Sequence, residues 1–288
     1  MEFPDYFADA EASFDNATFI LFGVPFEKTS SFRHGADKAP FEIRQASWNF
    51  ERYDLRTGSN FEQIKIHDYG NLEVEKLTSK EVFGATKAFT ASLLTKNKTP
   101  IALGGDHSIT PGIVSAFPKD IGVISLDAHM DFRQQYKNDI HNHACVIRRI
   151  ADHIPVENIA VLGIRSAEKE EYDQANEQKL FFRDAFTIHK DGLNNIIKET
   201  KTHLKGKKIY LTLDIDVVDP AYAPGTSTPE PFGLTPLQII EIIEAFSSQL
   251  IGCDLVEVCP PYDHGQTAVL AAKLVQTSIS WIWRHHQA

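Results

Sequence analysis

The stretch "IGVISLDAHMD", residues 121–131, begins as an apolar run and ends in charged residues. A near-continuous apolar run is typical of a strand that is buried on both faces of a sheet. Asp127, His129 and Asp131 follow at alternating positions, and in an extended chain such positions point to one side. The stretch therefore predicts a buried strand with a group of polar side chains at its carboxyl end.

Similar segments recur along the chain, with amphipathic helical patterns between several of them. They begin at Thr18, Ile64, Pro100, Ile121, Asn158, Lys179, Lys208 and Cys253. Helix start signals occur at Thr78 with Glu81 and at Thr235 before Pro236. Strands that alternate with helices predict a three-layer α/β/α fold with a mostly parallel sheet of about eight strands. A closed barrel would show more regular alternation, so we expect an open sheet in a single domain.

The composition limits the partners and the compartment. The excess of acidic over basic residues gives a formal net charge of −10. This charge argues against nucleic acid or an anionic membrane as a partner and favours a small cationic ligand. Three cysteines without CxxC spacing argue against a disulfide framework. The first apolar run, residues 18–22, is too short to span a bilayer, and the residues before it are acidic rather than basic. We therefore expect a cytoplasmic protein without a membrane partner.

Three of the predicted strands end in clusters of carboxylates and imidazoles. Ligands of open parallel sheets bind beyond the carboxyl ends of the strands, so these clusters are expected to meet. The candidate metal-binding side chains are His107, Asp127, His129, Asp131, Asp214 and Asp216, while Asp106 and Asp219 are expected to orient ligands or cap turns. Clustered carboxylates destabilise a fold unless a cation neutralises them. Oxygen and imidazole ligands without thiolate suit a divalent ion such as Mn²⁺, and six ligands fit two ions better than one.

Each motif has a simpler explanation when it is taken alone. A single Asp-x-Asp at the end of a strand is more often a solvated turn or a helix cap, and a single His there is more often structural. Caps do not account for all three motifs together, which favours the metal interpretation. Two metal ions about 3.5–4 Å apart can activate water and polarise an electrophile, as in many hydrolases.

The motifs resemble those of the ureohydrolases, the family of arginases and agmatinases, over nearly the whole chain. The matching strings are "GGDHS" (104–108), "SLDAHMD" (125–131), "LTLDIDVVDPAYAPGTSTPEPFGL" (211–234) and "EVCPPYD" (257–263). The resemblance implies one ureohydrolase catalytic domain over residues 1–288, which hydrolyses a guanidino group to urea and an amine. It also implies a homo-oligomer, either a trimer or a hexamer.

The resemblance assigns two Mn²⁺ ions to these residues, with Co²⁺ or Ni²⁺ left open. It places one ion at His107, Asp127, Asp131 and Asp214, and the other at Asp127, His129, Asp214 and Asp216. It further implies that Asp131 relays a proton to the departing amine and that Glu257 binds the guanidinium group. A loop histidine assists proton transfer in the family, and the pattern favours His143 over His141, although Ala144 and Cys145 replace the usual Gly and Thr.

The sequence constrains the identity of the substrate less than it constrains the type of reaction. Two metal ions, four aspartates, a hydroxide and Glu257 give a formal charge of about −2, which suits dicationic agmatine. Arginases usually carry Asn soon after the DxHxD motif, where this chain has Arg133. Agmatine is therefore preferred, with arginase, guanidinobutyrase and formimidoylglutamase as alternatives. Two other classes remain open: a catalytically inactive metal-binding homologue, and a two-metal phosphoesterase, which would need Arg or Lys beside the ions.

Overall fold

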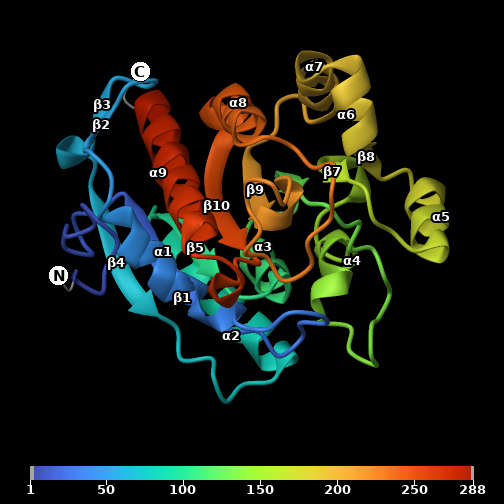
Figure 1. Ribbon diagram of the computed structural model, residues 1–288, viewed down its shortest axis with the longest axis horizontal. Helices are drawn as coiled ribbons and strands as arrows, with labels where there is room; N and C mark the ends of the chain where they lie inside the picture. The colour runs from blue at the N-terminus through green and yellow to red at the C-terminus, as the bar shows by residue number, and fades with distance from the viewer. Residues whose placement is uncertain (1–2, 287–288) are drawn as a thin grey trace.

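The computed structural model describes residues 3–286, which are built around one eight-stranded sheet (Figure 1). The strand order is β4-β1-β5-β10-β9-β6-β7-β8, and all neighbouring pairs in this sheet are parallel. The bounds are β1 Phe19–Val24, β4 Ile66–Asn71, β5 Thr99–Gly104, β6 Gly122–Leu126, β7 Ile159–Ile164, β8 Phe181–Asp184, β9 Ile209–Asp214 and β10 Leu250–Val256. Each of the eight predicted segments overlaps one of these strands. The sequence does not predict the short antiparallel pair β2 Tyr53–Asp54 and β3 Ser59–Asn60.

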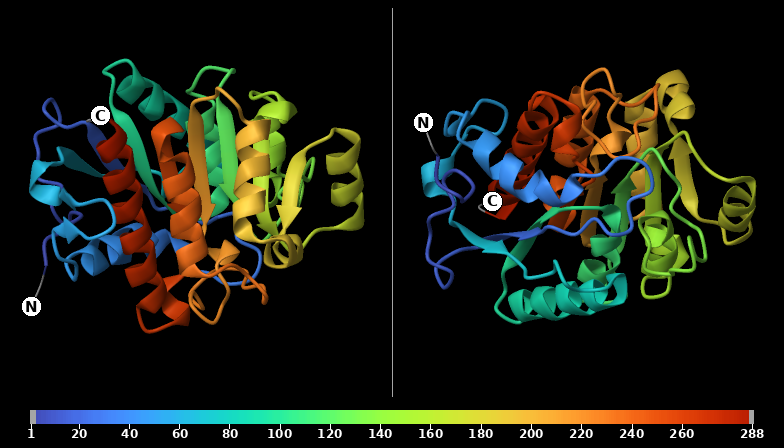
Figure 2. Two further views of the ribbon diagram at one scale, coloured as in Figure 1. Left: turned by 90° about the horizontal axis from the view of Figure 1, so that it is seen from above. Right: turned by 60° about the horizontal axis from the view of Figure 1, so that its bottom comes forward.

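Helices cover both faces of the sheet, so the predicted three-layer α/β/α architecture is confirmed (Figure 2). Alternation along β1 sends Phe19 and Leu21 into one core and Ile20 and Phe22 into the other. Helices α1 and α6 to α9 pack on the first core, and α2 to α5 pack on the second. Their bounds are α1 Ala39–Ser47, α2 Ser79–Leu94, α3 Thr110–Val114, α4 Val146–Ala151, α5 Lys169–Glu177, α6 Ala185–Asp191, α7 Leu193–His203, α8 Pro236–Phe246 and α9 Gln266–His286.

Both predicted helix start signals operate as capping boxes. The Thr78 hydroxyl accepts from the Glu81 backbone N–H, and the Glu81 carboxylate accepts from Thr78 in return. Thr235 and Gln238 make the same reciprocal pair at the start of α8, with Pro236 at its first position. Each cap satisfies backbone donors that the helix itself leaves free, which stabilises a helix by about 1 kcal/mol. Among residues 3–286, no helix is long and apolar enough to cross a bilayer.

The strand order brings four carboxyl ends together at the centre of the sheet. Strands β5, β10, β9 and β6 are consecutive, and Leu126 of β6 pairs with Leu213 of β9. Asp127 and Asp214 are the next residues along these two strands, so they lie side by side at the carboxyl end of the sheet. From the sequence, we expect the three clusters on neighbouring strands. In the structure, β10 lies between β5 and β9, which carry two of these clusters, and Glu257 follows β10 at the same edge of the sheet.

The alternation expected for residues 127–131 is only partly correct. Strand β6 ends at Leu126, and Asp131 has a φ of 48°, so the segment is not extended throughout. Ala128 and Met130 are buried, as expected for packing residues. A turn in the backbone after the strand, rather than strand alternation alone, therefore directs Asp131 toward the other polar side chains.

Candidate metal centre

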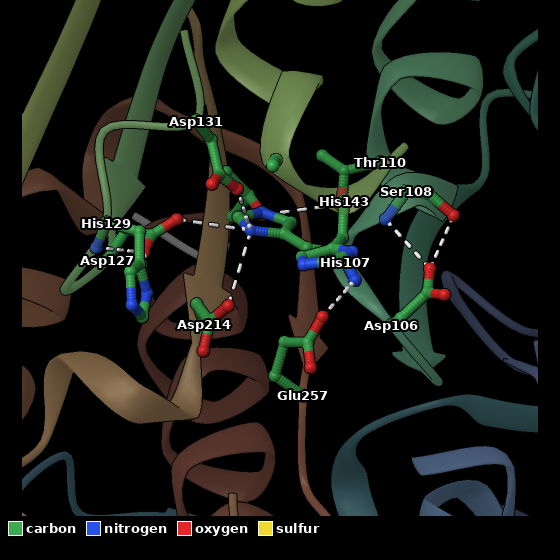
Figure 3. A network of polar contacts seen from close by, with 12 residues as sticks. Asp106, His107, Ser108, Thr110, Asp127, His129, Asp131, His143, Asp214 and Glu257 are labelled. Atoms are coloured by element: carbon green, nitrogen blue, oxygen red, sulfur yellow. Dashed lines mark hydrogen bonds and ion pairs between the residues drawn. The ribbon is translucent and has the colours of Figure 1, made fainter. Parts of the chain in front are cut away.

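One group of side chains surrounds His107 at the carboxyl ends of the central strands (Figure 3). The Nδ1 atom of His107 lies 3.2 Å from Asp127 Oδ2, 3.4 Å from Asp131 Oδ2 and 3.4 Å from Asp214 Oδ2. All four side chains are buried. His107, Asp127 and Asp214 have the mutual spacing of side chains that could hold a metal ion.

A second group adjoins the first and shares Asp127 with it. The Nδ1 atom of His129 lies 2.8 Å from Asp216 Oδ2 and 3.7 Å from Asp127 Oδ1. Asp127 therefore turns one carboxylate oxygen toward His107 and the other toward His129. A carboxylate shared in this way can bridge two ions, and all six predicted metal-binding residues lie in this cluster.

Burial and close charges shift the pKa values of several groups in the cluster far from their ordinary values. Burial raises the pKa of Asp131 to about 7, with Asp127 adding to the shift. Burial alone would lower the pKa of His129, but Asp216, Asp127 and Asp131 raise it to about 10. Burial likewise opposes ionisation of Asp216, yet His129 holds its pKa at about 2. Protons thus neutralise part of the cluster, and a divalent ion would displace them on binding.

The orientation of His107 fits a cation more closely than a hydrogen-bond network. Its Nε2 lies 2.9 Å from Thr212 Oγ1, and Thr212 donates its own hydroxyl hydrogen to Asp254 at 2.6 Å. Thr212 can therefore only accept from His107, so Nε2 carries a proton and Nδ1 is the ring nitrogen that faces the carboxylates. Neither Nδ1 nor the adjacent Asp127 Oδ2 makes a hydrogen bond to any residue that the structure describes. With Nδ1 unprotonated, its lone pair would face these carboxylates, and a positive ion between them would make that arrangement favourable.

Glu257 follows β10 and lies beside this cluster. Its side chain is buried, and its Oε1 atom accepts a hydrogen bond of 2.7 Å from the His107 backbone N–H. Burial raises the pKa of Glu257 to about 8, and Asp106 adds to the shift. Its φ of 64° lies in the left-handed region, as does that of Asp131. Non-glycine residues in this region cost about 1–3 kcal/mol each and concentrate at functional sites.

A pocket of about 250 Å³ opens over the cluster. Its lining includes Ser31, His129, Asp131, Arg133, Tyr136, His143, Glu168, Glu171, Asp214, Thr228 and Glu257. Of the two histidine candidates, only His143 is among the lining residues, whereas His141 packs against the ring of Phe83. Burial lowers the pKa of His143 to about 4, so its imidazole is neutral near pH 7. The neighbouring Cys145 is buried with a pKa raised to about 12, and it is therefore a neutral packing thiol.

Arg133 and two glutamates lie farther out in the pocket. The Arg133 guanidinium is 3.7 Å from Glu171 and 3.9 Å from Glu168, and it stacks on the ring of Tyr136 at 4.9 Å. Glu171 is buried and accepts from the Phe132 backbone N–H, whereas Glu168 is exposed. A ligand in this pocket would thus contact the Asp/His cluster at the base of the pocket, and the positive Arg133 and the two glutamates at its mouth.

Comparison with known proteins places this site in a family. The model of the arginase family matches residues 17–280. An agmatinase of Bacillus anthracis is 34% identical over 284 residues, which cover 96% of each chain. A guanidinobutyrase of Pseudomonas aeruginosa is 33% identical over 285 residues, with 96% of this chain and 89% of that protein covered. The crystal structure of the agmatine ureohydrolase of Thermoplasma volcanium has a TM-score of 0.95 and 38% identity, and it covers 100% of this chain and 97% of that one. The family predicted from the motifs is confirmed: the chain belongs to the arginase family of ureohydrolases.

Proposed function

We propose that the protein is a manganese-dependent agmatinase, which hydrolyses agmatine to putrescine and urea. The observation that carries the proposal is the pair of His/Asp groups that share Asp127 at the base of a pocket containing the buried Glu257. The agmatinase and agmatine ureohydrolase among the relatives support this choice of substrate.

The cluster would hold two divalent ions. His107, Asp127, Asp131 and Asp214 would bind one ion, and Asp127, His129, Asp214 and Asp216 would bind the other. When bound, the ions would supply an activated water and Lewis acidity, which the poorly electrophilic guanidinium carbon requires. Carboxylate and imidazole donors suit Mn²⁺, with Co²⁺ and Ni²⁺ as the other candidates.

Three side chains would handle the substrate and its protons. Glu257 would bind the guanidinium group through charge-assisted hydrogen bonds and hold its carbon over the cluster. Asp131 lies within the cluster and would transfer a proton toward the departing amine. His143 lines the same pocket as a neutral imidazole, so its ring nitrogen would accept or deliver protons at the pocket side.

The outer pocket bears on the choice of substrate. The ammonium group of agmatine would lie near Glu168 and Glu171, which outnumber the single cation Arg133 there. A second candidate substrate class, the guanidino acids, is favoured by Arg133 itself, because a guanidinium group binds carboxylates well. The guanidinobutyrase among the relatives belongs to this class.

We expect urea release from agmatine to exceed release from guanidinobutyrate, arginine and formiminoglutamate when the protein is loaded with Mn²⁺. The test measures kcat/KM for each compound after chelation and reconstitution with Mn²⁺, Co²⁺ or Ni²⁺, with bound metal quantified alongside. Loss of urea release after chelation and its return with metal are also expected. No urea from any compound, with a full metal complement, would contradict the proposal and favour an inactive homologue.

Arg133→Met provides a test of the substrate preference. We expect the KM for agmatine to fall about 3- to 10-fold, because removing the cation frees Glu171 and Glu168 to attract the substrate ammonium at about 1 kcal/mol. Guanidinobutyrate turnover should fall in the same variant. Arg56→Met, at an exposed arginine paired with Glu244 outside this pocket, is the matched control and should change neither value. A higher KM for agmatine, or unchanged turnover of guanidinobutyrate, would contradict this role of Arg133.

We also propose a cytoplasmic homo-oligomer, a trimer or a hexamer, that acts in polyamine biosynthesis. Phe186 and Phe232 are exposed with ring centroids 6.1 Å apart, which provides an apolar surface suited to a subunit contact. Light scattering on the purified protein would measure the mass of the assembly.

A further inference from the structure

The ring of His143 is held by residues that lie more than a hundred positions earlier in the chain. Its Nδ1 atom lies 3.2 Å from Thr29 Oγ1, and its Nε2 atom lies 3.3 Å from Ser31 Oγ. The His143 backbone N–H also donates to Thr29 Oγ1 at 3.0 Å. Thr29 therefore contacts both the backbone and the ring of the histidine that we place in proton transfer.

Thr29 is in turn anchored by Asp106, the residue before His107. Asp106 Oδ2 accepts from the Thr29 backbone N–H at 3.0 Å and from the Thr29 hydroxyl at 2.8 Å. Its Oδ1 atom accepts from the Ser108 backbone N–H at 3.1 Å. Asp106 and Thr29 are both buried, at 0% and 5% exposure, so water does not compete for these bonds. The backbones approach closely because residue 105 is glycine: a Cβ there would lie 2.0 Å from the Phe26 carbonyl oxygen.

The number of hydrogens in this network determines the state of the ring. Each oxygen of Asp106 accepts from a backbone N–H, and Oδ2 also accepts the hydroxyl hydrogen of Thr29. Thr29 donates its single hydroxyl hydrogen to Asp106. The two lone pairs of the Thr29 hydroxyl oxygen then accept from the backbone N–H of His143 and from the Nδ1–H of its ring. His143 must consequently carry its proton on Nδ1, which leaves the lone pair on Nε2 beside Ser31 in the pocket.

We propose that Thr29, anchored by Asp106, is a positioning residue that fixes the tautomer and orientation of His143 so that Nε2 is the proton-transferring atom. The proposal rests on the proposed hydrolase function and extends it to residues outside the metal cluster. Thr29 touches neither substrate nor metal in this role, and its effect passes entirely through His143. The signature is therefore a change in turnover with little change in substrate binding or metal content.

Thr29→Val removes the hydroxyl while keeping the side-chain shape. We expect kcat to fall about 10- to 100-fold, part of the 10²- to 10⁴-fold that a positioned acid or base contributes. The KM should stay within about 2-fold and the bound metal should be unchanged, because the cluster itself is intact. Thr29→Ser restores the hydroxyl and should recover kcat to within about 3-fold of the unmodified protein. Thr90→Val is the matched control, because Thr90 is equally buried but its hydroxyl has no hydrogen-bond partner among the described residues.

A spectroscopic measurement separates this proposal from the proposed function. Nitrogen-15 NMR of imidazole-labelled, metal-free protein, with the His143 signals assigned through His143→Gln, should show a protonated Nδ1 and an unprotonated Nε2. Thr29→Val should shift that pattern toward a mixture of tautomers. A ring protonated on Nε2 in the unmodified protein would overturn the proposal, and so would an unchanged kcat in Thr29→Val, lost metal in that variant, or no recovery in Thr29→Ser. Absence of urea release with the Nδ1–H tautomer present would instead count against the hydrolase function alone.

Discussion

Asp127→Asn is expected to lower kcat by at least about 10³-fold and to reduce the bound metal well below that of the unmodified protein. Asp127 is the residue that both His/Asp groups share, with one oxygen toward His107 and the other toward His129. An asparagine offers one neutral oxygen and one NH₂ donor, so it cannot bridge two cations. Loss of metal-assisted stabilisation of the transition state costs about 4 kcal/mol, which corresponds to the stated change in rate.

Thermal unfolding with and without metal gives a second measurement on the same variant. Metal at about 100 times its Kd stabilises a protein by about 2.7 kcal/mol per site, and Asp127→Asn should lose most of the resulting increase in Tm. Asp219→Asn is the matched control, because Asp219 belongs to the same motif as Asp214 and Asp216 but accepts backbone N–H groups of Ala221 and Gly233 outside both His/Asp groups. Full metal content and activity in Asp127→Asn would refute the bridging role.

The local features of the fold and site were predictable because their signals lie within short segments. Apolar runs predict the strands, and Thr78 with Glu81 predicts the start of α2, since each depends on residues a few positions apart. The same holds for the carboxylates after β6 and β9. Which strands are neighbours is not a local property, and so the position of β10 between β5 and β9 came only from the structure.

Residues that support the site were missed for different physical reasons. Thr212 and Asp254 are polar residues within apolar strands, and this is a usable signal for a buried hydrogen-bond network. Thr29 has no such signal, because its partner His143 is 114 positions away. The left-handed backbone of Glu257 was also unpredictable, since glutamate is not among the residues enriched in that region. Tertiary contacts impose this conformation, and local sequence does not encode it.

Glu257→Gln should lower activity and at the same time stabilise the metal-free protein. The amide oxygen of glutamine can still accept from the His107 backbone N–H, but it lacks the negative charge that would bind a guanidinium group. We expect kcat/KM for agmatine to fall about 10²-fold, the equivalent of about 2.7 kcal/mol. Glutamine also removes a carboxylate whose ionisation is opposed by burial and by Asp106 in the folded state.

The sign of the stability effect follows from the pKa of Glu257. Its value of about 8 in the folded protein lies above the ordinary 4.5, so the folded state favours the protonated form. Below about pH 4 the group is protonated in both states and does not oppose folding. Between 4.5 and 8 the unfolded chain ionises more readily, and the folded protein loses stability as the pH rises. At about pH 7 the variant should thus be more stable by about 3 kcal/mol, and near pH 4 the difference should vanish.

Urea denaturation of the chelated proteins at these two pH values measures the effect directly. Metal-free protein is essential, because bound cations would stabilise the Glu257 carboxylate and mask its cost. Glu62→Gln, at an exposed glutamate paired with Arg52, is the matched control and should change neither activity nor stability by more than about 0.5 kcal/mol. A variant that loses activity and stability together at pH 7 would mean that Glu257 is a structural residue. Lower activity together with a higher free energy of unfolding would mean that Glu257 destabilises the fold and is retained because its carboxylate binds the substrate guanidinium.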